Sequence, residues 1–200
     1  MSSAKTTPEA ARAVLDFWFG TPGSPAWNAS RREWFTNSDA FDENIRARFL
    51  SLWQAACDGA ADEWSVTAEG ACARIVLLDQ FPRNMFRGDA RSFATDGLAL
   101  ELAQRMIVQG LDHQLPTPWH RVFCYLPFEH AESLEAQEIS VRETQALRDE
   151  TGGKVDVVEW AVRHREIIAR FGRFPHRNAV LGRQSSTEEL HFLSQPGSSF

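Results

Sequence analysis

The chain has 200 residues, 43% of them hydrophobic and 24% charged, and it is rich in aromatic side chains, with seven Trp and fourteen Phe. This length and composition predict a globular fold with a buried core and exclude an intrinsically disordered chain. The formal net charge of -6 argues against a nucleic-acid partner, which would require a basic face.

The amino-terminal half predicts four helices with apolar residues at helical spacing. The first begins at Thr7-Pro8-Glu9, where Thr can cap and Pro suits the first position, and it ends at Gly20. The next three are predicted over residues 38–59, 67–80 and 90–109. A Phe81-Pro82 step is expected to end the third helix because the residue before a proline is disfavoured in the α region.

The carboxy-terminal half also reads as helical. The pattern from Thr117 to Glu150 contains Pro127, which either kinks one helix or begins a second. A further helix is predicted over residues 155–171, and Ser186 opens a capping box before a short terminal helix. With no strand-like alternation of any length, about seven helices predict an all-α fold.

No segment of the sequence is typical of a membrane or secreted protein. The stretch from Met1 to Pro8 lacks a basic region followed by an apolar run, and no apolar run approaches the roughly 20 residues of a membrane-spanning helix. The separate Cys57, Cys72 and Cys124 match neither a zinc spacing nor a disulfide framework. We therefore expect a cytoplasmic protein with no membrane partner.

One motif occurs twice. Phe81-Pro82-Arg83-Asn84 returns, with one residue inserted, as Phe174-Pro175-His176-Arg177-Asn178, and each copy follows an apolar helical run. The echo predicts that residues 1–200 form a single all-helical domain of two half-units. Their stacked antiparallel helix pairs would form a superhelix like a short helical repeat array.

The polar residues around these motifs are candidates for an anion-binding site. A guanidinium group grips a carboxylate or phosphate at two points, and helix amino-termini favour the same anions. The alternative is that these residues form ion pairs and caps in a purely structural network. The candidate ligand-binding residues are Asp79, Gln80, Arg83, Asn84, Arg87, Arg177 and Asn178.

Glu129, His130 and His176 are the candidate catalytic residues, since histidine titrates near neutrality and a carboxylate can tune it. Neighbours on a helix point about 100° apart, so Glu129 and His130 need not touch. A metal site would require three of these side chains and His164 to converge through folding alone, because no HxxxH or HExxH motif is present. We predict neither metal nor cofactor, and the sequence leaves open whether the protein is an enzyme.

Four motifs span nearly the whole chain: VLDFWFG from Val14, LLDQFPRN from Leu77, YLPFEH from Tyr125 and RFGRFPHRN from Arg170. In this order they resemble domain-of-unknown-function family 924, whose members are mostly bacterial. The resemblance implies an all-α superhelix like that of tetratricopeptide repeats, with no established activity. It also marks as family motif residues Asp79, Gln80, Arg83, Asn84, Glu129, His130, His176, Arg177 and Asn178. The chain departs from the family pattern at Ala131 and Ser133, where Ser and Asp are frequent.

Three functions are compatible with these features. The first, which we favour, is a pocket for a small anionic molecule between the half-units, with Glu129 or His130 transferring a proton where a reaction occurs. The second is a helical scaffold that binds a protein segment in a groove, anchored by Trp27 or Trp34. The third is a buried polar network that only fixes the two halves to each other.

Overall fold

The computed structural model describes residues 6–198, and the expectation that no secretory signal is present falls partly outside them, on residues 1–5. No strand occurs among the described residues, so the all-α prediction is confirmed. Short 3-10 turns and one π-helical segment, η3 (Val76–Gln80), connect the α-helices. The α-helices are α1 (Glu9–Phe19), α2 (Asp39–Cys57), α3 (Ala68–Ile75), α4 (Phe81–Met85), α5 (Asp96–Val108), α6 (Pro118–His130), α7 (Leu134–Glu150), α8 (Val158–Phe171) and α9 (Thr187–Leu193).

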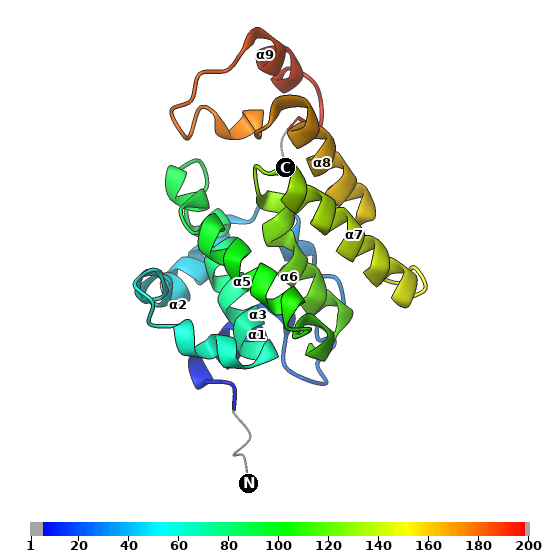
Figure 1. Ribbon diagram of the computed structural model, residues 1–200. Helices are drawn as coiled ribbons and strands as arrows, with labels where there is room; N and C mark the ends of the chain where they lie inside the picture. The colour runs from blue at the N-terminus through cyan, green and yellow to red at the C-terminus, as the bar shows by residue number, and fades with distance from the viewer. Residues whose placement is uncertain (1–5, 199–200) are drawn as a thin grey trace.

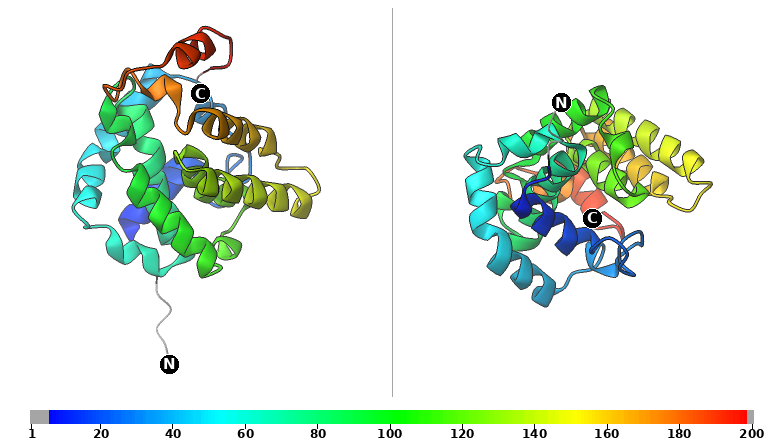
Figure 2. Two further views of the ribbon diagram at one scale, coloured as in Figure 1. Left: turned by 45° about the horizontal axis from the view of Figure 1, so that its top comes forward. Right: turned by 90° about the horizontal axis from the view of Figure 1, so that it is seen from below.

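A large hydrophobic core lies among α1 to α6, and a small second cluster lies at the carboxy-terminal end. Trp18, Leu77 and Phe123 belong to the large core and are essentially inaccessible to solvent. The small cluster consists of Ile167, Ile168 and Phe174, with Phe171 and Phe192 packed against it. Figure 1 shows α7 and α8 side by side and α9 at the end of the molecule opposite α1. The views in Figure 2 show the same separation of α9 from the helices around α1.

Helix starts follow the signals in the sequence. Ser38 caps α2 by accepting a hydrogen bond from the Phe41 amide, and Ser186 forms the expected capping box with Glu189 at the start of α9. At α1 the cap position is held by Pro8, while the Thr7 hydroxyl donates to Glu69 instead of capping. Local patterns therefore locate the helices well, even where one capping role is different.

The first Phe-Pro step lies inside a helical run, so the prediction that it ends the third helix is wrong. α3 passes directly into η3 and then α4, and Phe81 has helical dihedral angles of φ -60° and ψ -39°. Pro82 lacks a backbone donor and crowds the turn before it. The wider π turn makes room for the ring. The Thr95 hydroxyl donates to the Leu78 carbonyl at 2.5 Å, so that carbonyl has a partner.

The second Phe-Pro step does follow a helix end. α8 ends before Gly172, whose φ of 69° lies in the left-handed region that glycine adopts freely. Phe174 is extended, and Pro175 begins the 3-10 turn η6 (Pro175–Arg177). The two copies of the motif therefore have different backbones.

Pro127 neither ends α6 nor begins a new helix. α6 runs through it to His130, and the chain breaks at residues 131–133. Ser133 then caps α7 by accepting a hydrogen bond from the Ala136 amide. Glu129 and His130 consequently occupy the last turn of α6, which points them towards η3 and α8.

The loop before α2 packs its tryptophans on the core. Trp27 and Trp34 are both partly buried against the large cluster, and the Trp34 indole donates to the Trp18 carbonyl at 3.1 Å. Within residues 6–198, no helix combines the length and apolarity that a membrane crossing needs.

Gly70 and Gly97 offer a matched test of the packing around α3. A methyl group on Gly70 would lie 2.1 Å from the Trp64 carbonyl oxygen, whereas one on Gly97 in α5 would meet nothing within 4 Å. We expect Gly70→Ala to lower the free energy of unfolding by about 1–3 kcal/mol through overpacking. Gly97→Ala should raise it by about 0.5–1 kcal/mol, since alanine loses less backbone entropy in a helix. Urea unfolding of both variants measures the difference, and equal effects would contradict the packing described here.

Candidate functional site

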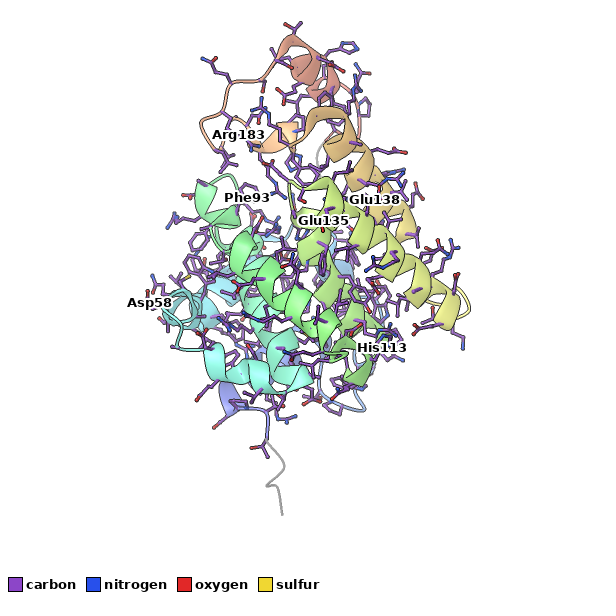
Figure 3. All side chains as sticks on the ribbon, in the orientation of Figure 1. Asp58, Phe93, His113, Glu135, Glu138 and Arg183 are labelled. Atoms are coloured by element: carbon purple, nitrogen blue, oxygen red, sulfur yellow. The ribbon has the colours of Figure 1, made fainter. Side chains whose placement is uncertain are left out.

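Seven polar side chains meet where the last turn of α6 faces η3, α4, the start of α5, α8 and η6. We call this group the polar cluster: Asp79, Arg83, Asp96, Glu129, His130, His164 and Arg177. It lies between the large core and the carboxy-terminal segment. Figure 3 labels Phe93 and Arg183 on two segments at this end of the molecule.

At the centre of the cluster, the Asp79 carboxylate is completely buried. Its oxygens lie 2.8 and 3.0 Å from His130 Nδ1, and Oδ2 accepts a second hydrogen bond from Gln80 Nε2 at 2.6 Å. Burial alone would raise the pKa of Asp79, but His130 and Arg83 outweigh it and hold this pKa below its usual range. Asp79 is therefore an ionised carboxylate at neutral pH.

His130 is a neutral imidazole at neutral pH. Burial and the nearby Arg83 charge lower its pKa, although Asp79 acts in the opposite direction. Because an ionised carboxylate only accepts hydrogen bonds, Nδ1 must carry the proton, and Nε2 is left as the proton acceptor. The His130 side chain is 15% exposed, so this edge of the cluster reaches solvent.

Arg83 and Arg177, one from each copy of the motif, share the carboxylate of Asp96. Arg83 grips Asp96 at two points, 2.8 and 3.0 Å, and also donates to the Asp79 carbonyl at 2.7 Å. Arg177 Nη1 reaches the same carboxylate at 3.3 Å. The Arg177 guanidinium packs over both the Phe93 and the Phe174 ring, 4.5 Å from each centroid.

Of the two arginines, Arg177 has the fewer hydrogen-bond partners. Its side chain is 8% exposed, and within residues 6–198 its Nε has no hydrogen-bond partner. Burial lowers the pKa of Arg177 to about 10, with the neighbouring Arg83 charge acting in the same direction. Arg177 therefore stays a cation at neutral pH, buried with spare donors.

Glu129 pairs with His164 rather than with its neighbour His130. Its Oε1 lies 3.2 Å from His164 Nδ1, which also lies 2.8 Å from the Trp160 carbonyl oxygen. Burial raises the pKa of Glu129 to about 8. A hydrogen bond from Ser140 lowers this pKa, and the Asp79 charge raises it. Burial also lowers the pKa of His164 to about 3. Both side chains are therefore neutral at neutral pH.

The cluster thus holds two carboxyl groups in opposite protonation states. Such a separation is what assigns acid and base roles in sites that transfer protons. Here the ionised Asp79 can stabilise a proton arriving at His130 Nε2, and Arg177 can stabilise a negative charge nearby. Within the described residues, no group of three or more His, Cys, Asp or Glu side chains is placed to hold a metal ion.

The remaining predicted site residues are placed around this centre with different partners. His176 packs beside Phe174, with ring centroids 5.6 Å apart, and burial lowers its pKa to about 4. Asn84 and Arg87 point away from the cluster and bind Asp42 on α2. The expected convergence of Arg87 with the other arginines is therefore wrong.

Asn178, from the second copy, braces the segment that follows η6. Its side chain donates to Ser185 at 3.0 Å and accepts from Arg183 at 2.9 Å. Arg183 in turn grips Glu132, which also accepts a hydrogen bond from the Phe174 amide. These contacts fix the segment that carries Arg177 against the end of α6.

Asp96 and His164 belong to the polar cluster and Phe93 packs on Arg177, although all three are absent from the residues predicted for the site. Asp96 and Phe93 fall in the predicted helix 90–109, where an acidic residue near a helix start has an ordinary local explanation. Nothing in that pattern links them to Arg177, 81 positions along the chain from Asp96. His164 shares a helix face with apolar residues and is therefore expected to be a core residue.

The cluster is closed by its own ion pairs. A surface cavity of about 470 Å³ lies elsewhere, between α8 and the carboxy-terminal segment, and is lined by residues such as Ile167, Phe171 and Phe192. The anion-binding pocket predicted from the sequence is thus filled, at the position of the arginines, by Asp96.

Glu129 makes stability depend on pH in a direction unusual for a carboxyl group. Its pKa rises from 4.5 to about 8 on folding, so the unfolded chain loses this proton first as the pH increases. The Glu129 contribution is fully present below pH 4.5 and is lost by pH 8, with a slope of up to about 1.4 kcal/mol per pH unit. We expect Glu129→Gln to gain stability relative to the parent across this window. Urea unfolding at several pH values, with exposed Glu135→Gln as control, measures this, and parallel pH profiles would contradict it.

The chain is similar to proteins of one family. The family described as bacterial protein of unknown function (DUF924) matches residues 14–197. Among solved structures, that of a protein of unknown function from Agrobacterium tumefaciens has 40% sequence identity, covers 92% of this chain and 96% of its own, and has a TM-score of 0.79. No curated protein matches the chain. Because the match extends over nearly the whole sequence, the chain belongs to the DUF924 family of bacterial proteins of unknown function.

Proposed function

We propose that the polar cluster binds a small anionic molecule, with Arg177 as its main partner and His130 as the group that exchanges a proton with it. The observation that carries this proposal is the state of Arg177. Its side chain is 8% exposed and its guanidinium carries five donors, yet it makes one hydrogen bond, at 3.3 Å, to the described residues.

An unsatisfied donor in such a place is costly. Leaving a buried polar group without a partner costs about 1–3 kcal/mol, and more for a charged group. Proteins rarely leave such groups unpaired unless water, an ion or a ligand completes them. A carboxylate or phosphate would supply paired acceptors to the planar guanidinium.

The proton-transfer part of the proposal rests on the Asp79–His130 pair. Asp79 fixes the ring by accepting from Nδ1, so a ligand meets Nε2 as a base. Glu129 is next to His130 in the sequence, where the two need not touch, and the carboxylate in contact with the His130 ring is that of Asp79. Glu129, neutral and 3.2 Å from His164 Nδ1, remains a second group able to give up a proton.

The structural-network alternative fits Arg83 better than Arg177. Arg83 has acceptors on Asp79 and Asp96, as expected of a brace between elements. The scaffold alternative requires Trp27 or Trp34 to anchor a partner, but both pack on the core and Trp34 is held by a backbone carbonyl. The cytoplasmic location, the two half-units and the tetratricopeptide-like stacking stay predictions.

Arg177→Met tests whether this arginine serves binding or stability. We expect its stability to stay within about 1 kcal/mol of the parent, because Arg83 still compensates Asp96 and an apolar chain of similar length fills the slot. We also expect acetate and inorganic phosphate to shift the His130 ring ¹⁵N signals of the parent but not of Arg177→Met. NMR titration with each anion at constant ionic strength measures these shifts, after the His130 signals have been assigned among those of the chain's six histidines.

Arg105→Met is the control, since Arg105 is exposed and, among residues 6–198, pairs only with Glu101 on the same helix. It should keep the full response to both anions. A large loss of stability in Arg177→Met, together with an anion response equal to that of the control, would favour the structural network over a binding site.

A further inference from the structure

We infer that Asp96 is an internal stand-in for the ligand, and that the ligand is a carboxylate that replaces Asp96 on Arg177. This inference rests on the proposed function and adds the ligand class and the step that opens the site. Arg177 and Asp96 are joined by a single hydrogen bond of 3.3 Å, although a planar guanidinium and a carboxylate can form two.

Arg83 and Arg177 differ in what other partners they have besides Asp96, and this difference allows a ligand to replace Asp96 on Arg177. Arg83 has a second anionic partner, since its Nη1 lies 3.5 Å from the Asp79 carboxylate and it also donates to the Asp79 carbonyl. Arg83 therefore stays compensated when Asp96 moves. The Glu132 and Asp79 charges also act on Arg177, but its side chain makes no second hydrogen bond to the described residues, so it gains most from a new acceptor.

The Asp96 side chain can also move out of the cluster into solvent. It is the first residue of α5, and its side chain is 20% exposed, so its carboxylate can turn into water without unwinding the helix. By contrast, Asp79 is 0% exposed and sits in the middle of a helical run. Asp96 is thus the one of the two carboxylates that can be displaced at low cost.

Charge balance points to a monoanion. Two guanidinium groups face two carboxylates, Asp79 and Asp96, so an anion added beside Asp96 would place like charges together. Replacing one carboxylate by another keeps the balance and the bidentate geometry. The Phe93 and Phe174 rings both pack against the Arg177 guanidinium, and a carboxylate would bind its N–H groups in the plane of the guanidinium.

Removing the competitor should strengthen binding. We expect Asp96→Asn to lower the Kd for acetate about tenfold relative to the parent, since the Asn side chain carries no charge to compete for Arg177. Glu101→Gln, the same change of charge on the exposed face of α5, should leave the Kd unchanged. NMR titration with acetate measures all three proteins, and equal Kd values for the two variants would overturn the inference.

A second measurement uses the unaltered protein and does not depend on the folding of Asp96→Asn. Saturating acetate should speed amide hydrogen exchange at the start of α5, where Asp96 loses its two arginine partners. Slower or unchanged exchange there would also overturn the inference. The proposed function fails separately, if acetate and phosphate leave the His130 signals of the parent and of Asp96→Asn unmoved.

Discussion

The structure depends on keeping one ionised carboxylate, that of Asp79, in a fully buried position. A buried charge is tolerated only when partners replace the lost water, and Asp79 has three: His130, Gln80 and Arg83. Each partner comes from a different part of the fold or of the helical run, so satisfying this one group fixes α6 against η3. The proton on His130 Nδ1 follows from this charge, and the proton retained by Glu129 follows mainly from burial, with the Asp79 charge adding to it.

The helical run through Pro82 and the polar cluster have a common origin. Pro82 removes a backbone donor, and the Leu78 carbonyl takes the Thr95 hydroxyl in its place. Since Asp96 follows Thr95 directly, the contact that repairs the helix also brings Asp96 within reach of Arg83. The π turn at residues 76–80 therefore belongs to the site as well as to the fold, as π-helical segments often do.

Sequence reasoning was reliable where structure is local. Helical periodicity, Gly20 and the Ser186 capping box located the helices, because these signals act within a few residues. The helix through Pro82 was unpredictable because its repair comes from Thr95, 17 positions along the chain from Leu78. For the same reason Asp79, Arg83, His130 and Arg177 could be chosen as site residues, but Asp96 could not. Asp96 is recognisable as a shared counter-ion only after folding has brought Arg83 and Arg177 together around it.

The polar side chains of the two copies of the Phe-Pro-Arg-Asn motif differ in how completely they are paired. In the first copy every polar side chain is engaged: Asn84 and Arg87 hold Asp42 on α2, and Arg83 bridges Asp79 and Asp96. In the second, Asn178 braces the segment after η6, but Arg177 keeps an unpaired Nε inside a nearly closed environment. An arginine needed only for the fold would gain from the acceptors that its counterpart has. The asymmetry therefore supports the proposal that binding occurs at the second copy, with the first copy as its rigid support.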